Sequence, residues 1–194
     1  MFKRIITLLK HWREVKTSLS TLSFLYGAQD DLDALGGLTE EEMSGLIRWL
    51  PEEGTFVEVG TLFGLTAKRI AAERPKLKII AVDNFSWNPF GLPPSIHEAF
   101  TRRILNGSGV ELVNCSSEDW RSGVEGAIDA IFFDASHRYE AVKAECAWAK
   151  KAGVKVICGH DYNNANPRFG VTRAVDEVFG KENVETCGMC WRVK

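Results

Sequence analysis

From Thr55 onward, short runs of consecutive apolar residues alternate with longer stretches in which apolar residues recur every three or four positions. The runs predict strands at 56–59, 78–82, 111–114, 128–133 and 154–158, and the stretches predict helices at 66–74, 95–105, 139–151 and 171–179. Apolar strands that alternate with helices are typical of a parallel sheet covered on both faces. With one or two more strands in the tail, we predict an α/β fold: a Rossmann-like, doubly wound, mostly parallel sheet of about six to seven strands with helices on both faces.

Two further helices are predicted ahead of this sheet. The second begins at Thr39, because Thr39 and Glu42 form a capping box. We assign residues 1–38 to an N-terminal helix and loop, and residues 39–194 to the main body of a single domain. The first helix is basic and is expected to dock on that body, with contact to a membrane surface as the alternative. Its apolar stripe consists of Ile5, Leu8, Trp12, Val15, Leu19 and Leu22.

Composition narrows the class of protein. The 194 residues are 45% hydrophobic and 26% charged, which is ordinary for a globular domain. A net charge of −2 argues against a surface built for nucleic acid, and no apolar run approaches the ~20 residues of a transmembrane helix. Five cysteines, an odd number, favour reduced thiols, and the CxxC at 187–190 has no second pair to complete a zinc site. We expect a cytoplasmic protein; the sequence does not predict its oligomeric state.

Polar or small residues follow every predicted strand. In an open parallel sheet, ligands bind in the crevice beyond the carboxyl ends of the strands. Five polar strand ends in succession therefore predict one binding site at that edge of the sheet. They are 58–64, Asp83, 116–120, 134–137 and 160–161, with Trp87 and Trp120 as candidates to flank the ligand.

The first strand end indicates the kind of ligand. A dinucleotide site would have G-x-G-x-x-G, whereas Gly60 and Gly64 give G-x-x-x-G after an acid, Glu58. Glu58 would repel a pyrophosphate but suits an amino group. Asp83, 23 residues after Gly60, is placed to accept hydrogen bonds from two ribose hydroxyls. A nucleoside with a cationic amino-acid arm satisfies both requirements, and that ligand is S-adenosylmethionine.

Four segments together resemble class I S-adenosylmethionine-dependent methyltransferases. They are FVEVGTLFGLTA (56–67), IIAVD (79–83), IDAIFFDASHRY (128–139) and CGHDY (158–162). The nearest branch contains catechol O-methyltransferases, macrocin-type sugar O-methyltransferases and cephalosporin-hydroxylase-like proteins; GVTRAVDE (170–177) is similar to that branch as well. The resemblance makes residues 39–194 an S-adenosylmethionine-binding methyltransferase domain.

The resemblance also implies roles for the cofactor-side residues. Glu58, Gly60 and Gly64 would shape the methionine pocket, with Thr61 and Thr66 near its amino and carboxylate ends. Asp83 would hold the ribose. The residues expected beside the adenine are Asn84, Ser117 and Glu118.

The same resemblance points to a divalent cation, Mg²⁺ or another. The metal ligands of such relatives correspond here to Asp134, His160 and Asp161. His160 departs from the usual carboxylate, and its nitrogen shifts the preference toward Mn²⁺, Fe²⁺ or Zn²⁺. His160 and Asp161 are adjacent, so both serve one site only if the chain turns there, which Gly159 permits. The alternative is that this pair shapes the pocket or binds the cofactor.

His137 stands where catechol-type relatives carry a catalytic lysine. An imidazole with a pKa near ~6.5 suits a general base, with Asp134 beside it in the catalytic group; a metal ligand or a polar loop residue are the alternatives for His137. The implied reaction is direct methyl transfer to a small hydroxylated acceptor, assisted by the cation. The competing functions are a cephalosporin-hydroxylase-like enzyme and a cofactor-binding domain without catalysis.

Overall fold

The structure is a computed structural model that describes residues 20–21, 23–24, 26–28, 35, 37–87 and 91–194. All six positions of the predicted N-terminal apolar stripe lie outside these residues. Within the described part, no helix has the length and apolar character needed to cross a membrane.

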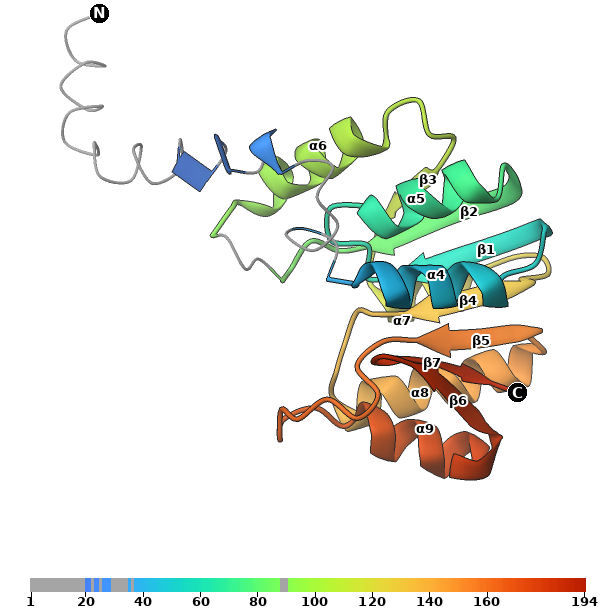
Figure 1. Cartoon of the computed structure of the whole chain (residues 1–194). Coiled ribbons are helices and arrows are strands. Elements are labelled where there is room, and N and C mark those ends of the chain that lie inside the picture. The colour runs from blue at the N-terminus through green and yellow to red at the C-terminus, as the bar shows by residue number, and fades with distance from the viewer. Residues whose placement is uncertain (1–19, 22, 25, 29–34, 36, 88–90) are drawn as a thin grey trace, which may run out of the picture.

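A seven-stranded sheet forms the centre of the molecule, in the order β3-β2-β1-β4-β5-β7-β6 (Figure 1). The first five strands are parallel, and β7 pairs antiparallel with both β5 and β6. This confirms the predicted Rossmann-like, mostly parallel sheet. The strands are β1 (Glu53–Val59), β2 (Lys76–Asp83), β3 (Glu111–Asn114), β4 (Ala130–Phe133), β5 (Val156–Gly159), β6 (Val184–Cys187) and β7 (Cys190–Val193).

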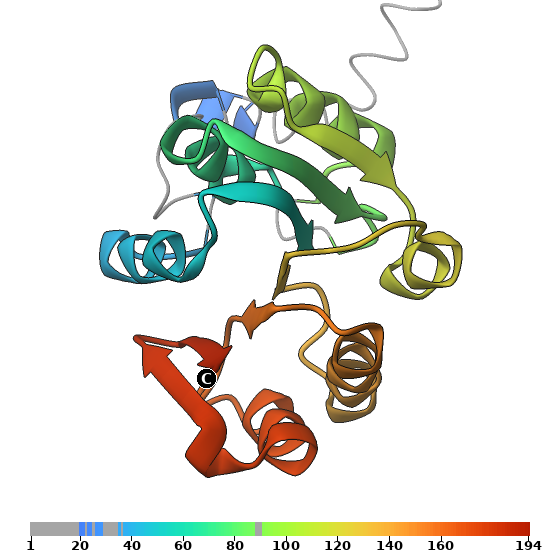
Figure 2. The same cartoon turned by 90° about the vertical axis from the view of Figure 1, so that its right-hand side faces the viewer.

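Helices cover both faces of the sheet, as Figure 2 shows from the side. One face carries α4 (Glu40–Trp49), α5 (Leu65–Glu73) and α6 (Pro94–Leu105). The other carries α7 (Ser117–Gly123), α8 (Tyr139–Ala152) and α9 (Val171–Phe179), and a 3-10 turn, η1 (Lys181–Asn183), precedes β6. Helix α7 was not predicted; its N-cap is Ser116, whose hydroxyl accepts the backbone N–H of Asp119 at 3.0 Å.

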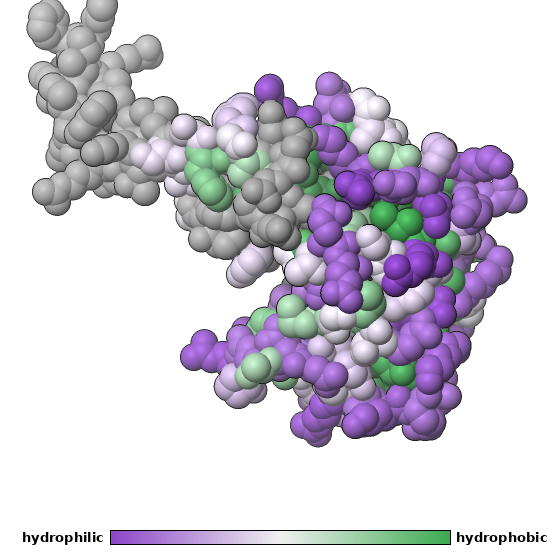
Figure 3. Space-filling model, viewed as in Figure 1, coloured by the Kyte–Doolittle hydropathy of each residue, from purple (hydrophilic) through white to green (hydrophobic). Residues whose placement is uncertain are grey.

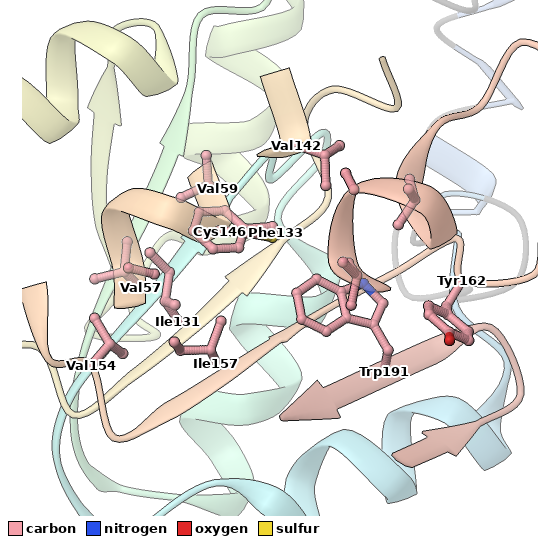
Figure 4. Packing of buried hydrophobic residues seen from close by; sticks show 14 of the residues in the cluster. Val57, Val59, Ile131, Phe133, Val142, Cys146, Val154, Ile157, Tyr162 and Trp191 are labelled. Atoms are coloured by element: carbon pink, nitrogen blue, oxygen red, sulfur yellow. The ribbon is translucent and has the colours of Figure 1, made fainter. Parts of the chain in front are cut away.

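Successive side chains of the central strands point to opposite faces of the sheet, which divides the core into two layers. Val57 and Val59 of β1 face α7, α8 and α9, whereas Phe56 faces α4 and α5. In β4, Ile131 and Phe132 divide between the layers in the same way. Figure 4 shows the first layer, in which Trp191 of β7 packs fully buried with residues of β4, β5 and α8. Both faces of β4 are therefore buried, which is why its sequence is continuously apolar.

The parallel register continues past the strand ends. The backbone N–H of Gly60 donates to Val82 O at 2.8 Å, and that of Asp134 donates to Val59 O at 2.8 Å. The N–H of His160 donates to Phe133 O at 3.1 Å. These bonds bring the loops after β1, β4 and β5 to one edge, toward which the strand arrows point in Figure 1.

The capping box at the start of α4 gives a first test. Thr39 Oγ1 accepts the N–H of Glu42 at 3.2 Å, and Glu42 Oε2 accepts the N–H of Thr39 at 2.9 Å. We expect Thr39→Ala to lower the free energy of unfolding by about 1 kcal/mol, because one helix N–H loses its partner. Urea unfolding of the variant and the parent protein measures this; an unchanged midpoint would show that the cap contributes nothing.

Candidate functional site

A cavity of about 430 Å³ opens at the carboxyl edge of the sheet, and Figure 3 shows the surface hollowed on that side. It is lined by the loops that follow β1 to β5 and by the turn between β6 and β7. The residues predicted to bind cofactor that line it are Glu58, Gly60, Thr61, Thr66, Asp83, Asn84 and Ser117. Asp134, His137, His160 and Asp161 line the same cavity. Of the predicted site residues, Gly64 and Glu118 do not line it, and Glu118 is exposed.

The two glycines of the turn after β1 have no room for a side chain. Gly60 has φ +92°, and a Cβ there would lie 2.5 Å from the Ala135 backbone, so the loops after β1 and β4 touch through main chain. Gly64, with φ +82°, starts α5 and lies against Leu105 of α6. Leu62 also has a positive φ, of 50°, and its carbonyl accepts hydrogen bonds from α6. The turn is thus held in one conformation by its neighbours.

Glu58 is buried at the floor of the cavity, where its carboxylate accepts the Thr61 hydroxyl. Burial raises the pKa of Glu58 to about 8; the Thr61 hydrogen bond opposes this shift, and the charges of Asp134 and Asp83 add to it. The ionised form is therefore costly without a positive partner. A ligand that brings an ammonium group into this part of the cavity would restore that partner.

Asp83 ties the glycine turn to the loop after β2. One carboxylate oxygen accepts the N–H of Leu62 at 2.8 Å, and the other accepts the N–H of Phe85 at 2.7 Å. Each oxygen keeps a second lone pair, so the carboxylate is fixed yet able to accept from a ligand hydroxyl. Its predicted role toward ribose stays a prediction.

The residues predicted to lie near the adenine or to flank the ligand differ in where the structure places them. Ser117 donates its hydroxyl to Glu145 of α8 at 2.6 Å, which leaves the lone pairs of Ser117 as acceptors. Trp87 lines the cavity and is 66% exposed. Trp120 is instead buried in the core against Trp148, with ring centroids 5.7 Å apart, so it does not flank the ligand. The prediction for Trp120 was wrong because α7, which the sequence did not reveal, turns its side chain inward.

Two carboxylates and two imidazoles meet at the ends of β4 and β5. His137 Nε2 lies 2.6 Å from Asp161 Oδ2 and 3.7 Å from Asp134 Oδ1. His160 Nδ1 lies 3.6 Å and 3.8 Å from the same two oxygens. Among the described residues, Asp134, His137 and Asp161 have ligand atoms within 4.8 Å of one another. His137 therefore joins the carboxylates that the sequence paired with His160, and which imidazole binds a metal stays a prediction.

The donor set fits a divalent cation. Ligand atoms that are each ~2.1 Å from one ion lie about 3–4 Å apart, and three of the four distances above fall in that range. Carboxylate oxygen with imidazole nitrogen is a combination that suits first-row transition ions.

The turn that gathers these groups occurs at Asp161, not at Gly159. Asp161 has φ +62°, a left-handed conformation that aspartate tolerates better than most residues. Asn164 Nδ2 donates to Asp161 Oδ1 at 2.5 Å and supports the turn. Gly159 is needed for a different reason: a Cβ there would lie 2.6 Å from Phe133 O and 2.7 Å from the Trp191 ring.

The two aspartates favour the charged form of the His137 imidazole. Burial lowers the pKa of His137, but hydrogen bonds to Asp134 and Asp161 outweigh burial and raise the pKa to about 9. The same contacts lower the pKa of Asp161 against the effect of burial. Phe169 stacks on the ring with centroids 4.2 Å apart and fixes its plane. The predicted value near 6.5 is thus wrong for this environment; the role of His137 as base stays a prediction.

Sequence reasoning missed two buried residues that support the site. His97 of α6 lies with Nε2 3.1 Å from Leu62 O, and so holds the glycine turn. Glu42, identified only as a capping residue, is buried with Oε1 3.5 Å from His160 Nε2. The capping box already accounted for Glu42, so no signal in the sequence pointed to a second role.

Residues 57–162, more than half of the 194-residue chain, match the family described as methyltransferase domains. This chain belongs to the methyltransferase-domain family. It is an S-adenosylmethionine-dependent methyltransferase, as its motifs indicated. The match ends at Tyr162, so it includes the loops after β1 to β4 and the end of β5, but not the hairpin formed by β6 and β7.

Solved structures share the fold of this methyltransferase. An O-methyltransferase from Bacillus cereus, in complex with S-adenosylhomocysteine, is 17% identical with a TM-score of 0.61; the match covers 92% of this chain and 91% of that one. The O-methyltransferase TomG from Streptomyces achromogenes, in complex with S-adenosylmethionine, is 16% identical with a TM-score of 0.55, over 79% and 78% of the chains. A search of the curated proteins finds no match to this sequence.

The contact between the loops after β1 and β4 generates a prediction for the methyltransferase. We expect Gly60→Ala to abolish S-adenosylmethionine binding in calorimetry and to destabilise the fold, because its Cβ would displace the Ala135 backbone. Gly107→Ala is the matched control: its φ is +79°, but nothing lies within 4 Å of the added Cβ. The control should lose only the ~1–2 kcal/mol of a left-handed alanine and bind the cofactor normally. Equal effects of the two variants would contradict the proposed contact.

Proposed function

We propose that this methyltransferase transfers the methyl group of S-adenosylmethionine to a hydroxyl oxygen of a small molecule, with a divalent cation held beside the acceptor. The observation that carries the proposal is that seven of the nine predicted cofactor residues and the Asp-His cluster line one cavity. A methyl donor bound by the predicted cofactor residues and an acceptor hydroxyl beside the Asp-His cluster would therefore lie in the same cavity. The O-methyltransferase neighbours of the same fold support this choice of acceptor.

The charge of the cavity supports the cationic donor. Four carboxyl groups face or border it, from Glu58, Asp83, Asp134 and Asp161. S-adenosylmethionine brings an ammonium and a sulfonium group, and a divalent cation brings two further positive charges. Burial raises the pKa of both Glu58 and Asp134, so positive ligands would favour the ionised forms of these groups.

The cation would be held by Asp134 and Asp161 together with an imidazole, His137 or His160. When bound, it stabilises the ionised form of the acceptor hydroxyl. Where His160 is that imidazole, His137 is the group proposed to accept the hydroxyl proton at Nε2. The charge of the cation would oppose the two aspartates that raise the pKa of His137, and would so favour its neutral form. Phe169 keeps the imidazole plane fixed, and the backbone bonds of Asp83 keep the glycine turn in place. Most of the acceleration would come from alignment of the donor and acceptor.

The first experiment is calorimetric titration of chelator-treated protein with S-adenosylmethionine, alone and with Mg²⁺ or Mn²⁺. We expect micromolar binding of the cofactor, and separate binding of the cation. Screening of phenols, catechols and sugars then follows formation of S-adenosylhomocysteine, with and without chelator. Turnover that a chelator leaves unchanged would overturn the role of the cation but not methyl transfer. Absence of cofactor binding under every condition would overturn the proposal as a whole.

The Asp-His cluster is tested by substitution at the end of β4. We expect Asp134→Asn to abolish turnover and weaken cation binding, because the cluster loses a negative ligand, while the fold is retained. Asp129→Asn is the matched control, since Asp129 precedes the opposite end of β4 and pairs with Lys155 at 2.7 Å. It should turn over normally. Activity that survives in Asp134→Asn would show that the site is misplaced.

A further inference from the structure

Glu42 is the buried carboxylate behind the Asp-His cluster, on the side of His160 away from the two aspartates. Its Oε1 lies 3.5 Å from His160 Nε2, whereas the opposite ring nitrogen, Nδ1, faces Asp134 and Asp161. Both residues are buried, Glu42 to 3% and His160 to 7% exposure. His160 Nε2 makes no hydrogen bond among the described residues, and the Glu42 carboxylate faces it at the ion-pair distance of 3.5 Å.

We propose that Glu42 is a positioning residue, which orients His160 so that Nδ1 binds the divalent cation of the active site. The inference rests on the proposed function, because it requires a cation between His160 and the aspartates. Histidines that bind metals commonly donate their other ring N–H to a carboxylate, which fixes the ring and makes the ligating nitrogen more basic. Glu42 occupies that place relative to His160.

The carboxylate of Glu42 is itself held from several directions. Oε2 accepts the Thr39 N–H at 2.9 Å, and Oε1 accepts the Met189 N–H at 2.7 Å across 147 positions of sequence. The turn between β6 and β7 makes room for it: a Cβ on Gly188 would lie 2.5 Å from Oε1. Gly45, one turn along α4, lets the helix approach Cys187 in the same way. The position of Glu42 is therefore determined by packing, as orienting a metal ligand requires.

The turn between β6 and β7 also binds the backbone of the residue that follows Asp161. Met189 O accepts the N–H of Tyr162 at 2.9 Å, directly after Asp161. Met189 thus joins Glu42 on one side to the end of β5 on the other. Glu42 therefore contacts His160 directly and is connected to Asp161 through Met189 and Tyr162. A shift of the Glu42 carboxylate would consequently affect both His160 and Asp161.

The test compares Glu42→Gln with Glu41→Gln in the full-length protein. Glu41→Gln makes the same change of charge one residue away, at an exposed position of α4. We expect Glu42→Gln to weaken Mn²⁺ and Co²⁺ binding about tenfold to a hundredfold in calorimetry, and to change the visible absorption of bound Co²⁺. The Glu41→Gln control should bind as the parent protein does.

A double substitution separates positioning from general destabilisation. If Glu42 acts through His160, Glu42→Gln should have no further effect on cation affinity once His160→Gln is present. Should Glu42→Gln fail to fold, Gly188→Ala displaces the carboxylate without deleting it and should weaken cation binding as well. Additive effects in the double variant, or equal loss in Glu41→Gln, would overturn the inference. If the parent protein binds S-adenosylmethionine but neither cation, this inference and the cation role both fail, and methyl transfer stands on the cofactor result.

Discussion

Main-chain hydrogen bonds that prolong the parallel ladder beyond the last residues of the strands are the constraint on which the cavity depends. They run from Gly60 to Val82, from Asp134 to Val59 and from His160 to Phe133. Each bond fixes the position at which a loop leaves the carboxyl edge of the sheet, and therefore where the side chains of that loop lie. Because Gly60 then lies directly against the Ala135 backbone, the position of the loop after β1 is linked to that of the loop that carries Asp134 and His137.

This arrangement places several carboxylates in a buried region, where desolvation disfavours their ionised forms. Fixed hydrogen-bond donors partly compensate: two backbone amides donate to Asp83, and His137 pairs with Asp161. Among the described residues, Glu58 receives a side-chain hydrogen bond from the Thr61 hydroxyl alone, and burial raises its pKa to about 8. A protein selected for stability alone would place apolar residues here, since buried charges seldom repay their desolvation. The arrangement is consistent with a site whose positive partners arrive with the ligands.

The sequence was informative where one local pattern determines the outcome. The capping box at Thr39 placed the start of α4, and the strand predicted at 111–114 coincides with β3. Polar strand ends identified the lining of the cavity, because parallel strands deliver their carboxyl ends to one edge. Helix α7 was missed since its seven residues are too short for an apolar period to show, although the Ser116 cap was visible.

What the sequence could not show are contacts made by distant segments. The turn at Asp161 depends on Asn164 and on the amide that Tyr162 gives to Met189, which no local pattern specifies. Glu42 is satisfied by Thr39 within its own helix, so its approach to His160 appears only when the β6–β7 hairpin folds against α4. The matched family segment ends before that hairpin. The support that we propose for the Asp-His cluster therefore comes from residues on both sides of the matched segment, Glu42 before it and the β6–β7 turn after it.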